Sequence, residues 1–196
     1  MSEIRRLAVF CGSNPGTRPD YIAAAKEFGA LLASRGIGIV YGGSSVGLMA
    51  ALADAALDEL GEVTGVIPRM LVEREVANTA LSDLRIVDSM HQRKALMADL
   101  ADGFVALPGG IGTLEEFFEV WTWGQLGMHA KPCGLLNVGG YFDPLLEFLD
   151  HAVEEKFVRD VHRSMVIVES DPTKLLDRFA EYVPPRVVKW VNAATI

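Results

Sequence analysis

Short, continuously apolar runs alternate with longer amphipathic segments along nearly the whole chain. Seven runs have the length and the β-branched content of strands: residues 7–11, 38–41, 63–67, 84–87, 103–107, 134–138 and 165–168. Six longer segments are expected to be helices: 19–35, 46–60, 89–100, 113–126, 143–156 and 172–181. Strands that are apolar on both faces are typical of parallel sheets covered by helices. The alternation predicts an α/β fold, with a doubly wound, mostly parallel sheet and helices on both faces.

The size and the charge of the chain limit the kind of protein it can be and the partners it can bind. It has 196 residues, of which 50% are hydrophobic, and a formal net charge of −8. This length suits one domain spanning 1–196, in which 184–196 begins with two prolines and is expected to form a C-terminal appendage. An acidic surface repels nucleic acids and anionic membranes, so we expect neither as a partner. Cys11 and Cys133 have no metal-ligand spacing, which favours a reduced cytoplasmic protein without a metal site.

Three glycine-rich turns follow predicted strands at the same edge of the sheet. They contain Gly12 and Ser13, then Gly43, then the run of Gly109, Gly110, Ile111 and Gly112. Ligands of doubly wound sheets bind beyond the carboxyl ends of the strands. Two interpretations stay open: a ligand approached closely by the main chain, or turns that need glycine only for their backbone angles. None of the turns has the GxGxxG or GxxxxGK[ST] pattern, which argues against a dinucleotide or P-loop site.

The third turn leads directly into a helix that is expected to begin at Thr113. Glycine N–H groups, a helix N-terminus and a threonine hydroxyl together suit a phosphate monoester. A second interpretation is a capping box, because Thr113 and Glu116 have the spacing at which Glu116 would only satisfy a backbone N–H.

The helix predicted at 113–126 has two apolar faces. The face expected to lie on the sheet carries Leu114, Phe117, Phe118 and Trp121. The opposite face carries Glu116, Val120, Trp123 and Gly127. We expect a second subunit to cover this opposite face, which predicts a homodimer with helix 113–126 near the interface. Cover by the C-terminal tail is the alternative.

Another helix start is marked by Ser89 and Gln92, which have capping-box spacing. Arg93 and Lys94 follow in the first turn, where each cation opposes the helix dipole by about 0.3–1 kcal/mol. In an acidic chain such a conflict indicates a binding site for an anion, with a solvated surface pair as the alternative. We expect His91 to be a surface or supporting residue rather than a catalytic base.

The segment PGGIGTLEE at 108–116 resembles the PGGxGTxxE signature of the LOG ("Lonely Guy") family. These are cytokinin riboside 5′-monophosphate phosphoribohydrolases, long labelled lysine decarboxylases. Segments 9–13, 42–49, 87–94 and 122–127 are similar as well, so the likeness covers nearly the whole chain. The resemblance implies a Rossmann-like fold, a dimer, and hydrolysis of the N-glycosidic bond of N6-modified AMP to a free base and ribose 5-phosphate. It implies no metal and no organic cofactor.

The resemblance also implies which residues act. Arg93 and Glu116 correspond to the catalytic pair. The residues expected to contact the substrate or its phosphate are Gly12, Ser13, Gly43, Glu75, Met90, Lys94, Gly109, Gly110, Ile111, Gly112, Thr113, Leu114, Glu115 and Thr122.

In the expected mechanism, an ionised Glu116 stabilises the positive charge that grows on the ribose and orients or deprotonates water. We expect the helix N-terminus and Arg93 to favour the ionised carboxylate. One helix, one strand and a turn separate the two residues, which suggests helix starts on neighbouring strands. The alternatives are a general AMP nucleosidase, a binding protein like the molybdenum-cofactor carriers, and a pyridoxal-phosphate-dependent lysine decarboxylase. A pyridoxal-phosphate enzyme needs a lysine that binds the cofactor, and none of the three glycine-rich turns contains one.

Overall fold

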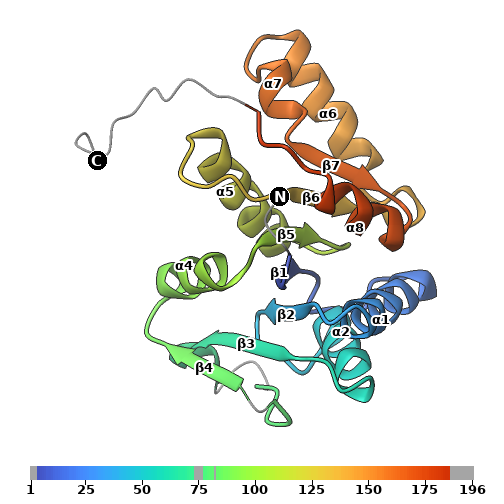
Figure 1. Cartoon of the computed structure of the whole chain (residues 1–196), viewed down its shortest axis with the longest axis vertical. Coiled ribbons are helices and arrows are strands. Elements are labelled where there is room, and N and C mark those ends of the chain that lie inside the picture. The colour runs from blue at the N-terminus through green and yellow to red at the C-terminus, as the bar shows by residue number, and fades with distance from the viewer. Residues whose placement is uncertain (1–3, 73–76, 82, 186–196) are drawn as a thin grey trace.

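Seven parallel strands form one sheet, in the order β4-β3-β2-β1-β5-β6-β7 (Figure 1). The strands are β1 (Arg6–Phe10), β2 (Gly38–Tyr41), β3 (Val63–Pro68), β4 (Asp83–Val87), β5 (Gly103–Ala106), β6 (Cys133–Leu136) and β7 (Val166–Glu169). This computed structural model describes residues 4–72, 77–81 and 83–185. Every pair of neighbouring strands in the sheet is parallel. The predicted doubly wound α/β fold is therefore confirmed.

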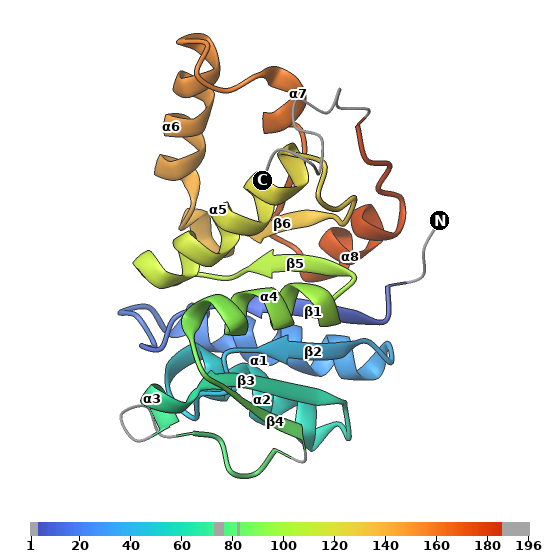
Figure 2. The same ribbon diagram turned by 90° about the vertical axis from the view of Figure 1, so that its left-hand side faces the viewer.

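Helices cover both faces of this sheet (Figures 1 and 2). The longer ones are α1 (Pro19–Ser34), α2 (Gly47–Asp58), α4 (Met90–Leu100), α5 (Ile111–Gln125), α6 (Asp143–Glu154) and α8 (Pro172–Ala180). Leu7 and Val9 of β1 lie in the core formed with α1, α2 and α8. Ala8 and Phe10 lie in the core formed with α4, α5 and α6. Because successive side chains of a strand point to opposite faces and both faces are covered, β1 is apolar from Leu7 to Phe10.

The face that α5 turns to the sheet differs in part from the expected one. Its buried positions are Thr113, Phe117, Val120, Trp121 and Gly124. Phe117 and Trp121 agree with the prediction, but Leu114 and Phe118 are only half-buried, and Val120 lies in the core. Thr113 and Gly124 are buried although they are small, Thr113 beside Gly109 and Gly124 beside the side chains of His129 and Met165. The periodicity of large apolar residues does not reveal such positions.

The chain winds in opposite directions on the two sides of β1. The loop after β1 leads to α1 on one face, and the loop after the neighbouring β5 leads to α5 on the other. Two loops that leave on opposite faces open a crevice between the strand ends, the usual ligand site of such sheets. Main-chain hydrogen bonds hold these loops together, from Gly12 N–H to the Pro108 oxygen (3.1 Å) and from Leu107 N–H to the Phe10 oxygen (2.9 Å).

Each predicted strand and helix corresponds to an observed one. Three short elements were not predicted, α3 (Arg69–Val72), η1 (Val138–Gly140) and α7 (Asp160–Arg163), because a single turn has too few residues to show a period. Of the expected appendage 184–196, residues 186–196 lie outside the described part of the chain. Among the helices that the structure describes, none has the length and apolar content needed to cross a membrane.

Candidate active site

A cavity of about 360 Å³ opens at the carboxyl ends of β1, β2 and β5. Its lining combines main chain from the glycine-rich turns with side chains at the starts of α4 and α5. The predicted site residues that line it are Gly12, Ser13, Met90, Arg93, Gly110, Ile111, Gly112, Thr113, Glu115 and Glu116. Segments far apart in the sequence thus meet at one place.

The start of α5 lies earlier than expected. Gly110 is the residue before the first helical one, and Leu114 N–H donates the first helical hydrogen bond to the Gly110 oxygen (3.2 Å). Thr113 is therefore inside the helix and buried, so the capping box of Thr113 and Glu116 is wrong. The extended backbone of Gly110 lets the helix begin without a side-chain cap. The N–H groups of Ile111, Gly112 and Thr113 consequently have no partner within the helix, and these residues line the cavity.

The glycines of the third turn distinguish the two interpretations of that turn. A Cβ added at Gly110 or Gly112 would meet nothing within 4 Å, and neither residue has a positive φ. Neither position therefore needs glycine for its backbone angles or for packing within the chain. Open space beside free N–H groups favours a ligand that approaches the main chain closely.

The start of α4 agrees with its prediction. Ser89 precedes the helix, and its hydroxyl accepts a hydrogen bond from Gln92 N–H (3.2 Å). The Gln92 side chain accepts from Asp88 N–H (2.9 Å), one residue earlier than in the standard box. His91 is exposed and does not line the cavity. Arg93, in the first turn, is 7% exposed, so the solvated-pair interpretation is wrong.

Arg93 and Glu116 form a buried ion pair inside the cavity. Arg93 Nη1 lies 3.8 Å from Glu116 Oε1, and the two side chains are 9% and 12% exposed. Arg93 Nε is buried and finds no hydrogen-bond partner among the described residues. Leaving such a donor unpaired costs about 1–3 kcal/mol. Arg93 is therefore a group that an anionic ligand would satisfy.

The sequence suggested that the helices carrying Arg93 and Glu116 follow neighbouring strands, but they do not. Strand β4, which precedes Arg93, is at the edge of the sheet, and three strands separate it from β5. Helix α4 makes up this distance because it crosses back over β3, β2 and β1 towards β5 (Figure 2).

Gly42, which the sequence analysis did not assign to the site, leaves room for this pair. It follows β2 directly, and a Cβ there would lie 2.1 Å from Arg93 Nη2 and 3.0 Å from Met49 Sδ. Only glycine allows the guanidinium to lie against the main chain at this point. The sequence feature that could have identified Gly42 is its place in the second glycine-rich turn.

Burial raises the pKa of the Glu116 carboxyl above its usual value, although the charge of Arg93 acts in the opposite direction. Arg93 thus favours the ionised form of Glu116, as expected, but burial, which was not considered, outweighs it. Glu116 lies beyond the first turn of α5, where the helix dipole has little effect, and the nearby carboxylates of Glu115 and Glu119 oppose its ionisation.

Lys94 forms ion pairs with α5 and does not line the cavity. Its Nζ lies 2.5 Å from Glu115 Oε1 and 3.1 Å from Glu119 Oε2, and it is not part of the lining. Burial lowers the pKa of Lys94, but the two carboxylates more than offset this, so its pKa is raised. Lys94 therefore stays protonated, and its charge ties α4 to α5.

Several other predicted site residues lie away from the lining. Gly43 has a φ of +74° and packs near Ile67 and Leu84. Leu114 is half-buried, and Thr122 is exposed. Glu75 lies outside the described residues. Contacts of these residues with a substrate stay predictions.

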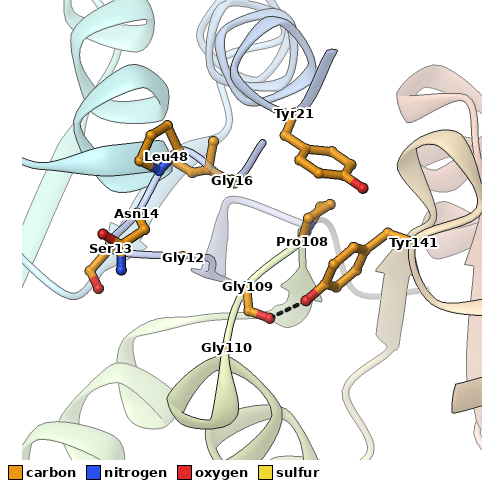
Figure 3. A pocket seen from close by; sticks show the side chains of 11 residues that line it. Gly12, Ser13, Asn14, Gly16, Tyr21, Leu48, Pro108, Gly109, Gly110 and Tyr141 are labelled. Atoms are coloured by element: carbon orange, nitrogen blue, oxygen red, sulfur yellow. Dashed lines mark hydrogen bonds between the residues drawn. The ribbon is translucent and has the colours of Figure 1, made fainter. Parts of the chain in front are cut away.

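A second cavity of about 260 Å³ adjoins the first, and Gly12, Ser13 and Gly110 line both (Figure 3). Gly109, also predicted, lines only this second cavity. Tyr21 and Tyr141 contribute its aromatic wall and were missed in the sequence. For Tyr141 the available signal was its place in the loop that follows β6, at the ligand edge of the sheet.

Solved structures share this architecture. A molybdenum cofactor carrier protein from Chlamydomonas reinhardtii superposes with a TM-score of 0.70 at 19% identity, covering 92% of this chain and 100% of that chain. The molybdenum cofactor binding protein from Rippkaea orientalis gives 0.69 at 20% identity, covering 92% and 98%. At such identities the likeness extends to the fold alone.

Sequence relatives are much closer. The family model described as "Possible lysine decarboxylase" matches residues 49–179. The chain is 49% identical over 183 residues to the cytokinin riboside 5′-monophosphate phosphoribohydrolase LOG of Oryza sativa subsp. japonica, covering 93% of this chain and 76% of that protein. The cytokinin riboside 5′-monophosphate phosphoribohydrolase LOG1 of Arabidopsis thaliana is 47% identical, covering 93% of this chain and 86% of that protein. On this identity, the chain belongs to the LOG family of cytokinin riboside 5′-monophosphate phosphoribohydrolases, the family that its sequence motif indicated.

Proposed function

We propose that this protein hydrolyses the N-glycosidic bond of N6-modified AMP, a cytokinin riboside 5′-monophosphate, to the free base and ribose 5-phosphate. The observation that carries the proposal is the Arg93–Glu116 pair, buried in one cavity with the open N–H groups at the start of α5. The relatives named above carry this activity in their names.

The residues present can perform each part of this reaction. The N–H groups of Gly110 to Thr113 and the Arg93 guanidinium bind the phosphate. The bond between C1′ and the base nitrogen breaks with its electron pair on the base, so positive charge grows on the ribose. The Glu116 carboxylate stabilises that charge and accepts a proton from the water that attacks C1′. The departing base takes up one proton, so water supplies both the hydroxyl and the proton of the products.

The test is a comparison of substrates. Release of ribose 5-phosphate or ribose is measured from AMP, isopentenyl-AMP and the two matching nucleosides. Charge-assisted hydrogen bonds contribute about 1.5–3 kcal/mol each, so loss of two of them predicts a kcat/KM for nucleosides about 10³-fold lower. Equal rates for nucleotides and nucleosides would contradict the phosphate site. The ratio of AMP to isopentenyl-AMP decides between a general AMP nucleosidase and a cytokinin-specific enzyme.

Two alternatives remain, a carrier-like binding protein, which the same assay tests, and a lysine decarboxylase. A carrier-like binding protein would retain nucleotides without releasing free base. A lysine decarboxylase would need an unprotonated lysine amine for pyridoxal phosphate, whereas no described residue in the cavity lining is a lysine, and Lys94 is held by two carboxylates.

We expect the activity to fall on the acid side at a pH above the usual range of glutamate. Burial raises the pKa of Glu116, so the carboxylate needed as a base is lost as the pH falls through that raised value. The acid limb of kcat/KM reports the free enzyme and is the quantity to measure. A limb at or below the ordinary glutamate pKa of 4.5 would argue against Glu116 as the base.

We also propose a homodimer with α5 near its interface, and a cytoplasmic location. The apolar side chain of Leu126, at the end of α5, is 41% exposed, which favours a partner there. Cys11 and Cys133 are free and buried, as is usual in a reducing compartment. Light scattering of the purified chain measures its mass and so tests the dimer.

A further inference from the structure

The second cavity has a feature that the proposed reaction does not use. Tyr141, which follows η1, donates a hydrogen bond from its hydroxyl to the Gly109 oxygen, with 2.5 Å between the oxygens (Figure 3). This bond joins the loop after β6 to the glycine-rich turn after β5. The two segments are 32 residues apart in the sequence.

The Tyr141 ring is held so that its hydroxyl keeps this direction. It packs edge-on against Tyr21 at 5.6 Å between ring centroids and against Phe142 at 5.0 Å. Its backbone N–H donates to the Val138 oxygen (3.1 Å). These contacts on two sides of the ring support the position in which its hydroxyl bonds to the Gly109 oxygen.

The bond to Gly109 fixes the orientation of one peptide group. A trans peptide is planar, so the C=O of Gly109 and the N–H of Gly110 point in opposite directions. The oxygen of Gly109 points to Tyr141 in the second cavity, and Gly109 lines that cavity only. The Gly110 N–H consequently points away from Tyr141, and Gly110 also lines the cavity that holds Arg93 and Glu116.

In the described part of the chain, no other hydrogen bond to the Gly109 oxygen orients the Gly109–Gly110 peptide. The preceding peptide is held separately, because Gly12 N–H donates to the Pro108 oxygen (3.1 Å). At Gly110 there is open space, since a Cβ would meet nothing within 4 Å. Among the described residues, only the Tyr141 hydroxyl bonds to the Gly109 oxygen.

We propose that Tyr141 is a positioning residue for the phosphate site. From the neighbouring cavity it holds the Gly109–Gly110 peptide so that the Gly110 N–H faces the phosphate of the nucleotide. This rests on the proposed function, because it assigns the phosphate to the turn at the start of α5. Tyr141 does not touch the substrate in this arrangement and acts only through the main chain.

The test uses Tyr141→Phe, which removes the hydroxyl and keeps the ring. Calorimetry measures the binding of ribose 5-phosphate and of adenosine to the full-length protein, since the first carries the phosphate and the second lacks it. We expect ribose 5-phosphate to bind about 3- to 10-fold more weakly in Tyr141→Phe, the usual effect of one hydrogen bond, and adenosine to change less than about twofold. Tyr21→Phe is the matched control, because its hydroxyl lies in the same cavity without bonding to Gly109, and both ligands should bind it as they bind the wild type.

Each other outcome overturns the proposal. Unchanged binding of ribose 5-phosphate in Tyr141→Phe, or an equal loss for both ligands, would mean that the hydroxyl has no role or only a general structural one. If the wild type turns over nucleotides while Tyr141→Phe keeps its affinity for ribose 5-phosphate, only the role of Tyr141 is wrong. If the wild type binds no ribose 5-phosphate, the phosphate site of the proposed function is wrong as well.

Discussion

Replacing Glu116 by glutamine is expected to lower kcat by about 10³-fold while nucleotide binding stays measurable, because a positioned acid–base group contributes about 10²–10⁴-fold. Glutamine has nearly the same shape, but it can neither accept a proton from water nor carry the charge that stabilises the ribose cation. In the proposed mechanism the phosphate contacts are made by other groups, Arg93 and the start of α5, so affinity should change little. Single-turnover rates and calorimetric affinity for AMP measure the two effects separately.

The control for this variant is Glu154→Gln, at an exposed carboxylate of α6 far from the cavity lining. It should keep wild-type activity. Because Glu116→Gln leaves Arg93 buried beside a neutral group, its thermal unfolding has to be measured as well, to separate lost chemistry from lost folding. Full activity in a folded Glu116→Gln protein would refute the assigned role.

Gly42→Ala is expected to lower kcat/KM by about 10²-fold without much loss of stability, since a misplacement of about 1 Å in a catalytic group can cost this much. The new Cβ would lie 2.1 Å from Arg93 Nη2, so the guanidinium has to move. The tip of an arginine side chain can shift at little cost to folding, but Arg93 would then lose its place 3.8 Å from Glu116. Steady-state kinetics and thermal unfolding give the two quantities.

A double-mutant cycle shows whether the effect passes through Arg93. In an Arg93→Ala background the colliding nitrogen is absent, so adding Gly42→Ala should change kcat/KM little. If Gly42→Ala is as harmful in that background as in the wild type, the glycine acts in another way, such as through its contact with Met49.

The turn after β5 was identifiable from the sequence because the phosphate site proposed there depends on the main chain. Neither Gly110 nor Gly112 is needed as glycine for packing or for a positive φ, so the two glycines stand out in the sequence as well as in the structure. The basic start of α4 was identifiable for a similar reason, since Arg93 in its first turn conflicts with the local helix dipole and the conflict needs an explanation.

The sequence alone determined the strands, the longer helices and the edge of the sheet where the two cavities lie, because hydrophobic periodicity and glycine-rich turns are local properties. The tertiary structure decided what depends on distance through space. It placed Arg93 beside Glu116, although three strands separate β4 from β5. It also paired Lys94 with the carboxylates of α5, and it placed the Tyr141 hydroxyl within hydrogen-bond distance of the Gly109 oxygen. It also decided the direction of the Glu116 pKa, which burial raises although Arg93 favours the carboxylate. The cost of burying a charge depends on everything packed around it, and no short segment of sequence contains that information.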